Sequence, residues 1–307
     1  FIPDASNNRV MVFNLDSSNR LIDRIADNVI GQDDLYTNAG ARVTQSGITA
    51  PTAVAVDLVG QRLFVAQPSG NRVTVYDIAT ITNGEPAVNV LGQANFTASV
   101  STTSQAGLNS PSGLAYDEVN RRLFVSQSGA NRVSIFDVAS ITDGEAAANV
   151  LGQATFTGGA TSNASTGMNN PQGLAFDNVG QRLFVVQVSN NRVTVYDVAT
   201  STITNGKAAS YILGQSSFAG TSNVTSRTGM DFPSGVAFDS STNRIFVSQS
   251  NGFRVTSYDV ATSTIANGSN ALNVLGQTNF TNRLTLSGQT GMLTAYGLVD
   301  YPGNRHL

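Results

Sequence analysis

A unit of about 61 residues is repeated five times along the 307-residue chain, and this repetition constrains the fold more than any other feature. One arginine marks each copy: Arg9, Arg72, Arg132, Arg192 and Arg254. The glutamine of a Gly-Gln pair marks the same five copies: Gln32, Gln93, Gln153, Gln215 and Gln277. The spacings are 63, 60, 60 and 62 residues for the arginines and 61, 60, 62 and 62 for the glutamines, so both markers define one period.

Each copy is predicted to form four short strands. In the third copy they lie at 112–117, 122–127, 132–139 and 148–153, with Gly, Asn and Asp at the turns between them. No segment shows the length and period of an amphipathic helix. Four-stranded units at constant spacing predict an all-β fold, a β-propeller of five four-stranded blades, with part of a six-bladed propeller as the alternative.

The first strand of each copy has a small residue at its second position: Ala53, Gly113, Gly173, Gly235 and Gly297. Small residues permit two backbones to approach closely. We therefore expect this strand to be the innermost one of each blade, where the blades converge.

The two ends of the chain resemble consecutive parts of one copy. Residues 297–307 match 173–184, and residues 1–13 match 184–196. Closure by such a shared blade removes exposed sheet edges. We expect a single domain over 1–307, closed by a blade split between 1–32 and 296–307, with further blades at about 51–93, 111–153, 171–215 and 233–277.

The strand sequences resemble the NHL-repeat family of β-propellers. The motif PSGLAYD at 111–117, followed by RLFVSQ and ANRVSIFD at 122–127 and 130–137, is similar to the family pattern. The long VLGQ-containing form is similar to arrays in bacterial surface and secreted proteins, which implies an extracellular or cell-surface location. Family propellers usually have six shorter blades; we expect five because head and tail complement each other. One departure is a glutamine where the family has aspartate, which only Asp4 keeps: Gln67, Gln127, Gln187 and Gln249.

The recurrent arginines have two interpretations, an anion-binding ring or a set of blade-internal contacts. We favour contacts with the carboxylates of the first strands, because an Arg–carboxylate pair suits a partly buried site: Asp57, Asp117, Asp177 and Asp239. The Gly-Gln pair is likewise interpreted as structural. Its glycine permits a bulge or positive φ, and the glutamine amide can cap open backbone groups.

Catalysis is not expected. The chain has no cysteine and one histidine, His306, which excludes thiol chemistry and a three-histidine zinc site. All three glutamates (Glu85, Glu118 and Glu145) fall in predicted turns or loops. We expect no catalytic residues, no cofactor and no metal site, with a metal-dependent lyase or lactonase as the less favoured alternative. Asp33 and Asp34 are interpreted as a solvated loop end rather than a Ca²⁺ site.

Composition restricts the partners. Charged residues make up 12% of the chain and the net charge is −3, so no basic surface for nucleic acid is expected. No apolar run is long enough to insert into a membrane. The chain begins with Phe1 and shows no signal-peptide pattern, so we expect a processed or excised chain.

Five Asn-x-Ser/Thr sequons are candidate glycosylation sites: Asn95, Asn163, Asn223, Asn267 and Asn279. Several sequons arise by chance in a chain rich in Asn, Ser and Thr, and O-glycans are an alternative.

We predict a non-catalytic extracellular or cell-surface propeller that acts as a binding or scaffold module. The long loops at about 94–110, 154–170 and 216–232 are expected on one face, where a protein or glycan binds. The alternative is a structural subunit of an extracellular filament or surface layer, assembled from identical subunits by propeller contacts or exchange of terminal strands.

Overall fold

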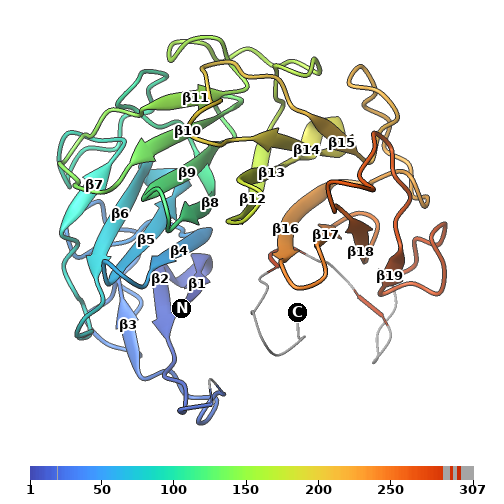
Figure 1. The fold of residues 1–307 in the computed structure, drawn as a ribbon. Helices are drawn as coiled ribbons and strands as arrows, with labels where there is room; N and C mark the ends of the chain where they lie inside the picture. The colour runs from blue at the N-terminus through green and yellow to red at the C-terminus, as the bar shows by residue number, and fades with distance from the viewer. Residues whose placement is uncertain (19, 286–290, 293–295, 299–307) are drawn as a thin grey trace. The chain divides into compact units, whose positions relative to one another are not determined.

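The computed structural model describes residues 1–18, 20–285, 291–292 and 296–298. Five antiparallel sheets follow one another along this part of the chain, and the described residues contain no α-helix (Figure 1). The sheets are the blades of a five-bladed β-propeller. The all-β fold class predicted from the repeat is therefore confirmed.

Each sheet is made of strands that are consecutive in sequence. The first has three described strands: β1 (Ile2–Asp4), β2 (Arg9–Val12) and β3 (Asn28–Ile30). The second contains β4 (Ala53–Asp57), β5 (Arg62–Gln67), β6 (Arg72–Asp77) and β7 (Asn89–Leu91). The third contains β8 (Pro111–Asp117), β9 (Arg122–Gln127), β10 (Arg132–Asp137) and β11 (Asn149–Leu151).

The last two sheets repeat this order. The fourth contains β12 (Pro171–Asp177), β13 (Arg182–Gln187), β14 (Arg192–Asp197) and β15 (Tyr211–Leu213). The fifth contains β16 (Pro233–Asp239), β17 (Arg244–Gln249), β18 (Arg254–Asp259) and β19 (Asn273–Leu275). Three short 3₁₀ turns follow β1, β5 and β13: η1 (Ala5–Asn7), η2 (Pro68–Gly70) and η3 (Val188–Asn190). The strand that the tail is expected to add to the first blade falls mainly in 299–307, outside the described residues.

The chain divides into two compact units. One consists of Phe1–Ala130 and Ile135–Ala148, and the other of Asn131–Ser134 and Asn149–Leu307. The expectation of one domain over 1–307 stays a prediction.

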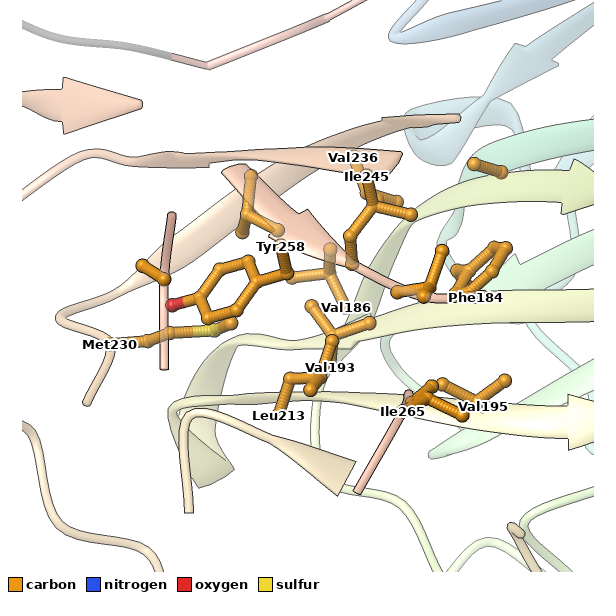
Figure 2. Packing of buried hydrophobic residues seen from close by; sticks show 14 residues of the cluster. Phe184, Val186, Val193, Val195, Leu213, Met230, Val236, Ile245, Tyr258 and Ile265 are labelled. Atoms are coloured by element: carbon orange, nitrogen blue, oxygen red, sulfur yellow. The ribbon is translucent and has the colours of Figure 1, made fainter. Parts of the chain in front are cut away.

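The core lies between successive sheets of a unit, as Figure 2 shows for the second unit. Phe184, Val186 and Leu213 of the fourth sheet pack against Ile245 and Tyr258 of the fifth. All five side chains are fully buried. A sheet with a neighbour on each side buries both of its faces, which explains why the middle strands are apolar throughout instead of alternating.

The small residue near the start of the innermost strand has a steric cause. A Cβ atom on Gly173 would lie 2.7 Å from the Ser234 oxygen and 2.9 Å from the Cα of Gly235 in the next blade. Such distances leave no room for a side chain. The innermost strands β12 and β16 therefore approach each other as the sequence predicts.

Candidate functional site

The recurrent arginines hold the long loops that leave their own blades. Four of them, all but Arg9, are fully buried. Each donates to the carbonyl oxygen three positions after the glutamine of the Gly-Gln pair. The contacts are Arg9 with Leu35 (2.7 Å), Arg72 with Phe96 (2.5 Å), Arg192 with Phe218 (2.6 Å), Arg254 with Phe280 (2.5 Å) and Arg132 with Phe156.

The same guanidinium groups also reach the long loop that precedes their blade. These second contacts are Arg72 with the Gly47 oxygen (2.9 Å), Arg192 with the Asn163 oxygen (2.8 Å) and Arg254 with the Ser226 oxygen (3.1 Å). In the second unit, the Asn163 amide also donates directly to Ala219 at 2.9 Å. These arginines therefore join successive long loops into one connected surface within each unit.

The expected pairing of these arginines with first-strand carboxylates is wrong. Arg72 lies opposite Gln67 across its hairpin and donates to it at 3.1 Å, whereas Asp57 lies opposite Arg62 across the preceding hairpin. The carboxylates form their ion pairs with that second set of arginines: Arg62–Asp57 at 2.6 Å, Arg122–Asp117 at 2.6 Å and Arg182–Asp177 at 2.7 Å. Asp239 instead accepts from Ser241 and Thr242. Strand register decides each partner.

In the second, fourth and fifth blades a glutamine at the end of the second strand accepts from the buried arginine. Gln187 and Gln249 accept from Arg192 and Arg254 at 3.0 Å and 2.9 Å, and only the first blade has a carboxylate there, Asp4. Burial lowers the pKa of Arg192 to about 10. Carbonyl oxygens from the loops thus provide the hydrogen bonds that stabilise the buried charge, and the guanidinium groups are not positioned as an exposed anion site.

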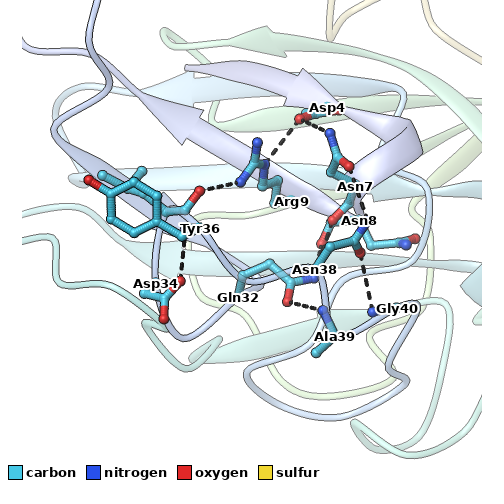
Figure 3. A network of polar contacts seen from close by, with 11 residues as sticks. Asp4, Asn7, Asn8, Arg9, Gln32, Asp34, Tyr36, Asn38, Ala39 and Gly40 are labelled. Atoms are coloured by element: carbon cyan, nitrogen blue, oxygen red, sulfur yellow. Dashed lines mark hydrogen bonds and ion pairs between the residues drawn. The ribbon is translucent and has the colours of Figure 1, made fainter.

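The glutamine of Gly-Gln acts as a clamp on the start of the long loop. Gln93 Nε2 donates to the Asn71 and Val100 oxygens at 2.7 and 2.9 Å, and its Oε1 accepts the Val100 amide at 3.1 Å. Gln153, Gln215 and Gln277 make the equivalent contacts. Figure 3 shows the first-blade version, in which Gln32 accepts the Ala39 amide at 3.1 Å.

The asparagine before the recurrent arginine is a further anchor, to which the sequence alone assigned no role. Asn71 adopts a left-handed φ of 48°, a conformation that asparagine tolerates better than most residues. Its side chain donates to the Ser99 oxygen at 3.0 Å and accepts the Ser110 amide at 2.9 Å. One side chain therefore ties both ends of the loop 94–110 to the blade. Recurrence of Asn at this position was the available signal.

Two equivalent cavities lie beside these anchors. A cavity of about 210 Å³ is lined by Gly92, Gln93 and the loop 94–110, and one of about 320 Å³ by Gly152, Gln153 and the loop 154–170. Their walls are made mostly of Gly, Ala, Ser and Thr. Such shallow sites offer hydrogen bonds and contacts with small apolar atoms rather than charge.

All five sequon asparagines are exposed, and they differ in their local contacts. Asn95 and Asn279 accept hydrogen bonds from the threonines two residues later, at 3.0 Å from each backbone amide. Asn267 accepts the Ile212 amide at 3.1 Å. All five stay candidate modification sites.

The acidic candidates form local contacts. Asp34 accepts the amides of Tyr36 and Thr37, and Asp33 lies 3.4 Å from Arg42. In the part of the chain that the structure describes, no three His, Cys, Asp or Glu side chains form a group that could hold a metal ion. Nor does any helix there have the length and apolar character for a membrane span. His306 lies outside the described residues.

The five sheets make the chain a β-propeller, and side chains of its blades anchor its long loops. Its fold is similar to that of the solved nidogen/laminin complex, with 15% identity, a TM-score of 0.49, and coverage of 82% of this chain and 69% of that chain. The solved structure of U3-55K gives 13% identity, a TM-score of 0.47, and coverage of 73% and 51%. The chain thus spans about half the length of the second relative. No protein-family profile and no curated protein matches the chain, so the NHL resemblance stays a prediction.

Proposed function

We propose that this chain is a non-catalytic binding module, placed outside the cell or at its surface, that presents its long loops to a protein partner. We use the name long-loop surface for the loops 154–170 and 216–232 of the second unit and, separately, for the loop 94–110 of the first unit. One observation carries the proposal: buried arginines join successive long loops, so the recurring polar groups serve to fix this surface. A fixed surface binds with a smaller loss of conformational entropy than mobile loops would.

The composition of the long-loop surface favours a protein over a glycan. Its exposed side chains are mainly Ser, Thr, Asn and Ala, with glycines between them. Ser, Gly and Asn are also the residues that supply adaptable hydrogen bonding in antibody loops. Phe232, at 40% exposure, is the large aromatic side chain that these loops expose. An extracellular partner suits the neutral polar surface and the exposed sequons.

Substitution of one exposed alanine beside each cavity tests this proposal. Ala94→Arg and Ala154→Arg place a long charged side chain at the same point of two successive loops. The control is Val179→Arg, at a position that is 91% exposed in the turn at the opposite end of β12 from the long loop. Binding of labelled chain is measured on arrays of purified secreted proteins and of glycans.

We expect at least one protein ligand whose affinity falls about tenfold or more with the two loop variants and is unchanged with the control. Ligands found only among glycans would contradict the protein assignment. Binding that all three variants leave unchanged would contradict a role for the long-loop surface.

A further inference from the structure

Four Asn-Gly pairs occur in the chain, and they begin at Asn83, Asn205, Asn251 and Asn267. Asparagine is a chemically labile residue, and a following glycine makes it more so. The backbone nitrogen of the glycine can attack the side-chain carbonyl carbon of the asparagine, because glycine has no side chain to hinder the approach. The local structure around each pair decides whether these two atoms can meet.

Three of the four pairs lie in a turn that caps the outer strand of the preceding blade. The asparagine oxygen accepts the amide of the middle residue of that strand, at 3.0 to 3.1 Å: Asn83 from Val29, Asn205 from Val150 and Asn267 from Ile212. The glycine amide donates back to the carbonyl oxygen of the same strand residue, at 2.9 to 3.1 Å.

Each cap keeps the two reacting groups apart. In the fourth blade, the Asn205 side chain is held by the Val150 amide, and the Gly206 nitrogen directs its hydrogen at the Val150 oxygen. Both groups of the pair are therefore bound to a neighbouring strand and do not face each other. The cap must open before the asparagine can react.

The remaining pair, Asn251-Gly252, lies in the turn between β17 and β18. It has no such cap among the residues that the structure describes: neither the Asn251 side chain nor the Gly252 amide hydrogen-bonds to any of them. In the third blade the residue equivalent to Gly252 is Ala130, whose amide donates to the Gln127 oxygen at 3.2 Å. Both reacting atoms belong to adjacent residues of one hairpin, so the reaction needs no other part of the chain.

We propose that Asn251 is the site at which this chain undergoes spontaneous deamidation. A bond forms between the Gly252 nitrogen and the Asn251 side-chain carbon, the bond from that carbon to Nδ2 breaks, and the proton of the Gly252 amide leaves with the nitrogen as ammonia. Water then opens the cyclic imide and leaves aspartate or isoaspartate. No group is oxidised or reduced. The modification is independent of the proposed partner binding.

The modified residue lies beside the buried arginine of the fifth blade. A Cβ atom on Gly252 would lie 3.3 Å from Arg254 Nε, so the turn packs directly on this guanidinium group. Arg254 in turn donates to loop oxygens of Ser226 and Phe280. Isoaspartate lengthens the backbone between Asn251 and Gly252. Deamidation therefore alters the hairpin that positions this anchor.

Peptide mapping by mass spectrometry, with chromatography that separates aspartate from isoaspartate, tests the proposal. The folded chain and the chain unfolded in guanidinium are stored at mildly alkaline pH. Dividing each folded rate by the unfolded rate of the same pair removes the influence of neighbouring residues. The control variant is Gly252→Ala, which introduces the residue of the third blade at a position without a positive φ. Circular dichroism shows that the variant is folded.

In the folded wild type, the normalised rate at Asn251 should exceed the rates at the three capped pairs by about thirtyfold, because two hydrogen bonds of a cap must break first. Gly252→Ala should nearly abolish the reaction at Asn251 and leave the capped pairs unchanged. Similar normalised rates at all four pairs would overturn the proposal, and so would a faster reaction at any capped pair.

Discussion

Substitution of Arg192 by methionine should lower the free energy of unfolding by about 3–5 kcal/mol. Methionine fills much of the same volume but leaves the Phe218 and Asn163 carbonyl oxygens without their donor. Each unsatisfied buried acceptor costs about 1–3 kcal/mol, and the Gln187 oxygen loses two donors as well. The measurement is equilibrium unfolding in urea, with the slope of the transition checked for two-state behaviour.

Arg24→Met is the matched control, because Arg24 is an exposed arginine in the loop between β2 and β3. Substitutions at such surface positions change stability by about 0.5 kcal/mol or less. If Arg192→Met costs no more than this control, the buried arginines are not what holds the loops.

Substitution of Gly214 by alanine should cost about 2–4 kcal/mol. The residue has a φ of 88°, which L-residues adopt only at a cost of about 1–2 kcal/mol. Its new Cβ would lie 2.8 Å from Met230 Cγ and 2.9 Å from the Asn191 oxygen, and such overpacking adds about 1–3 kcal/mol. Thermal and urea unfolding of the same protein measure the loss.

Gly40→Ala separates the two causes. Gly40 has a similar positive φ of 75°, but no atom lies within 4 Å of the position where its Cβ would be. It should therefore show the backbone cost alone, about 1–2 kcal/mol. Equal losses at the two glycines would contradict a packing role for the Gly-Gln pair at the junction with Met230.

The repeat predicts the blades because period, turn residues and strand residues are all local properties of the sequence. The small residues at the start of the innermost strands are also predictable, since convergence affects every copy alike. The hydrogen-bond and ion-pair partners of the arginines are not a local property of the sequence, because they depend on strand register. That register places Gln67 opposite Arg72, and it places Arg62 opposite the carboxylate of Asp57.

The anchors across loops could not be read from the sequence for a similar reason. The Phe96 and Gly47 oxygens that accept from Arg72 are backbone atoms, so no side-chain pattern marks them. The fifth copy departs from the pattern at one of these anchors. Phe253 replaces the anchoring asparagine in the fifth copy alone and keeps its left-handed φ of 49°. The strand with which the tail is expected to complete the first blade falls mainly in 299–307, outside the described residues.

The proposed binding surface requires long loops that are held as firmly as the strands. Hydrogen–deuterium exchange followed by NMR tests this most directly, because it reports the opening of each backbone amide. The informative amides are those of Val100 and Ser110, which donate to Gln93 and Asn71. We predict that they exchange nearly as slowly as the strand amide of Val73. Exchange at the rate of an unstructured chain would contradict the claim that the repeated Arg, Gln and Asn side chains fix the long-loop surface.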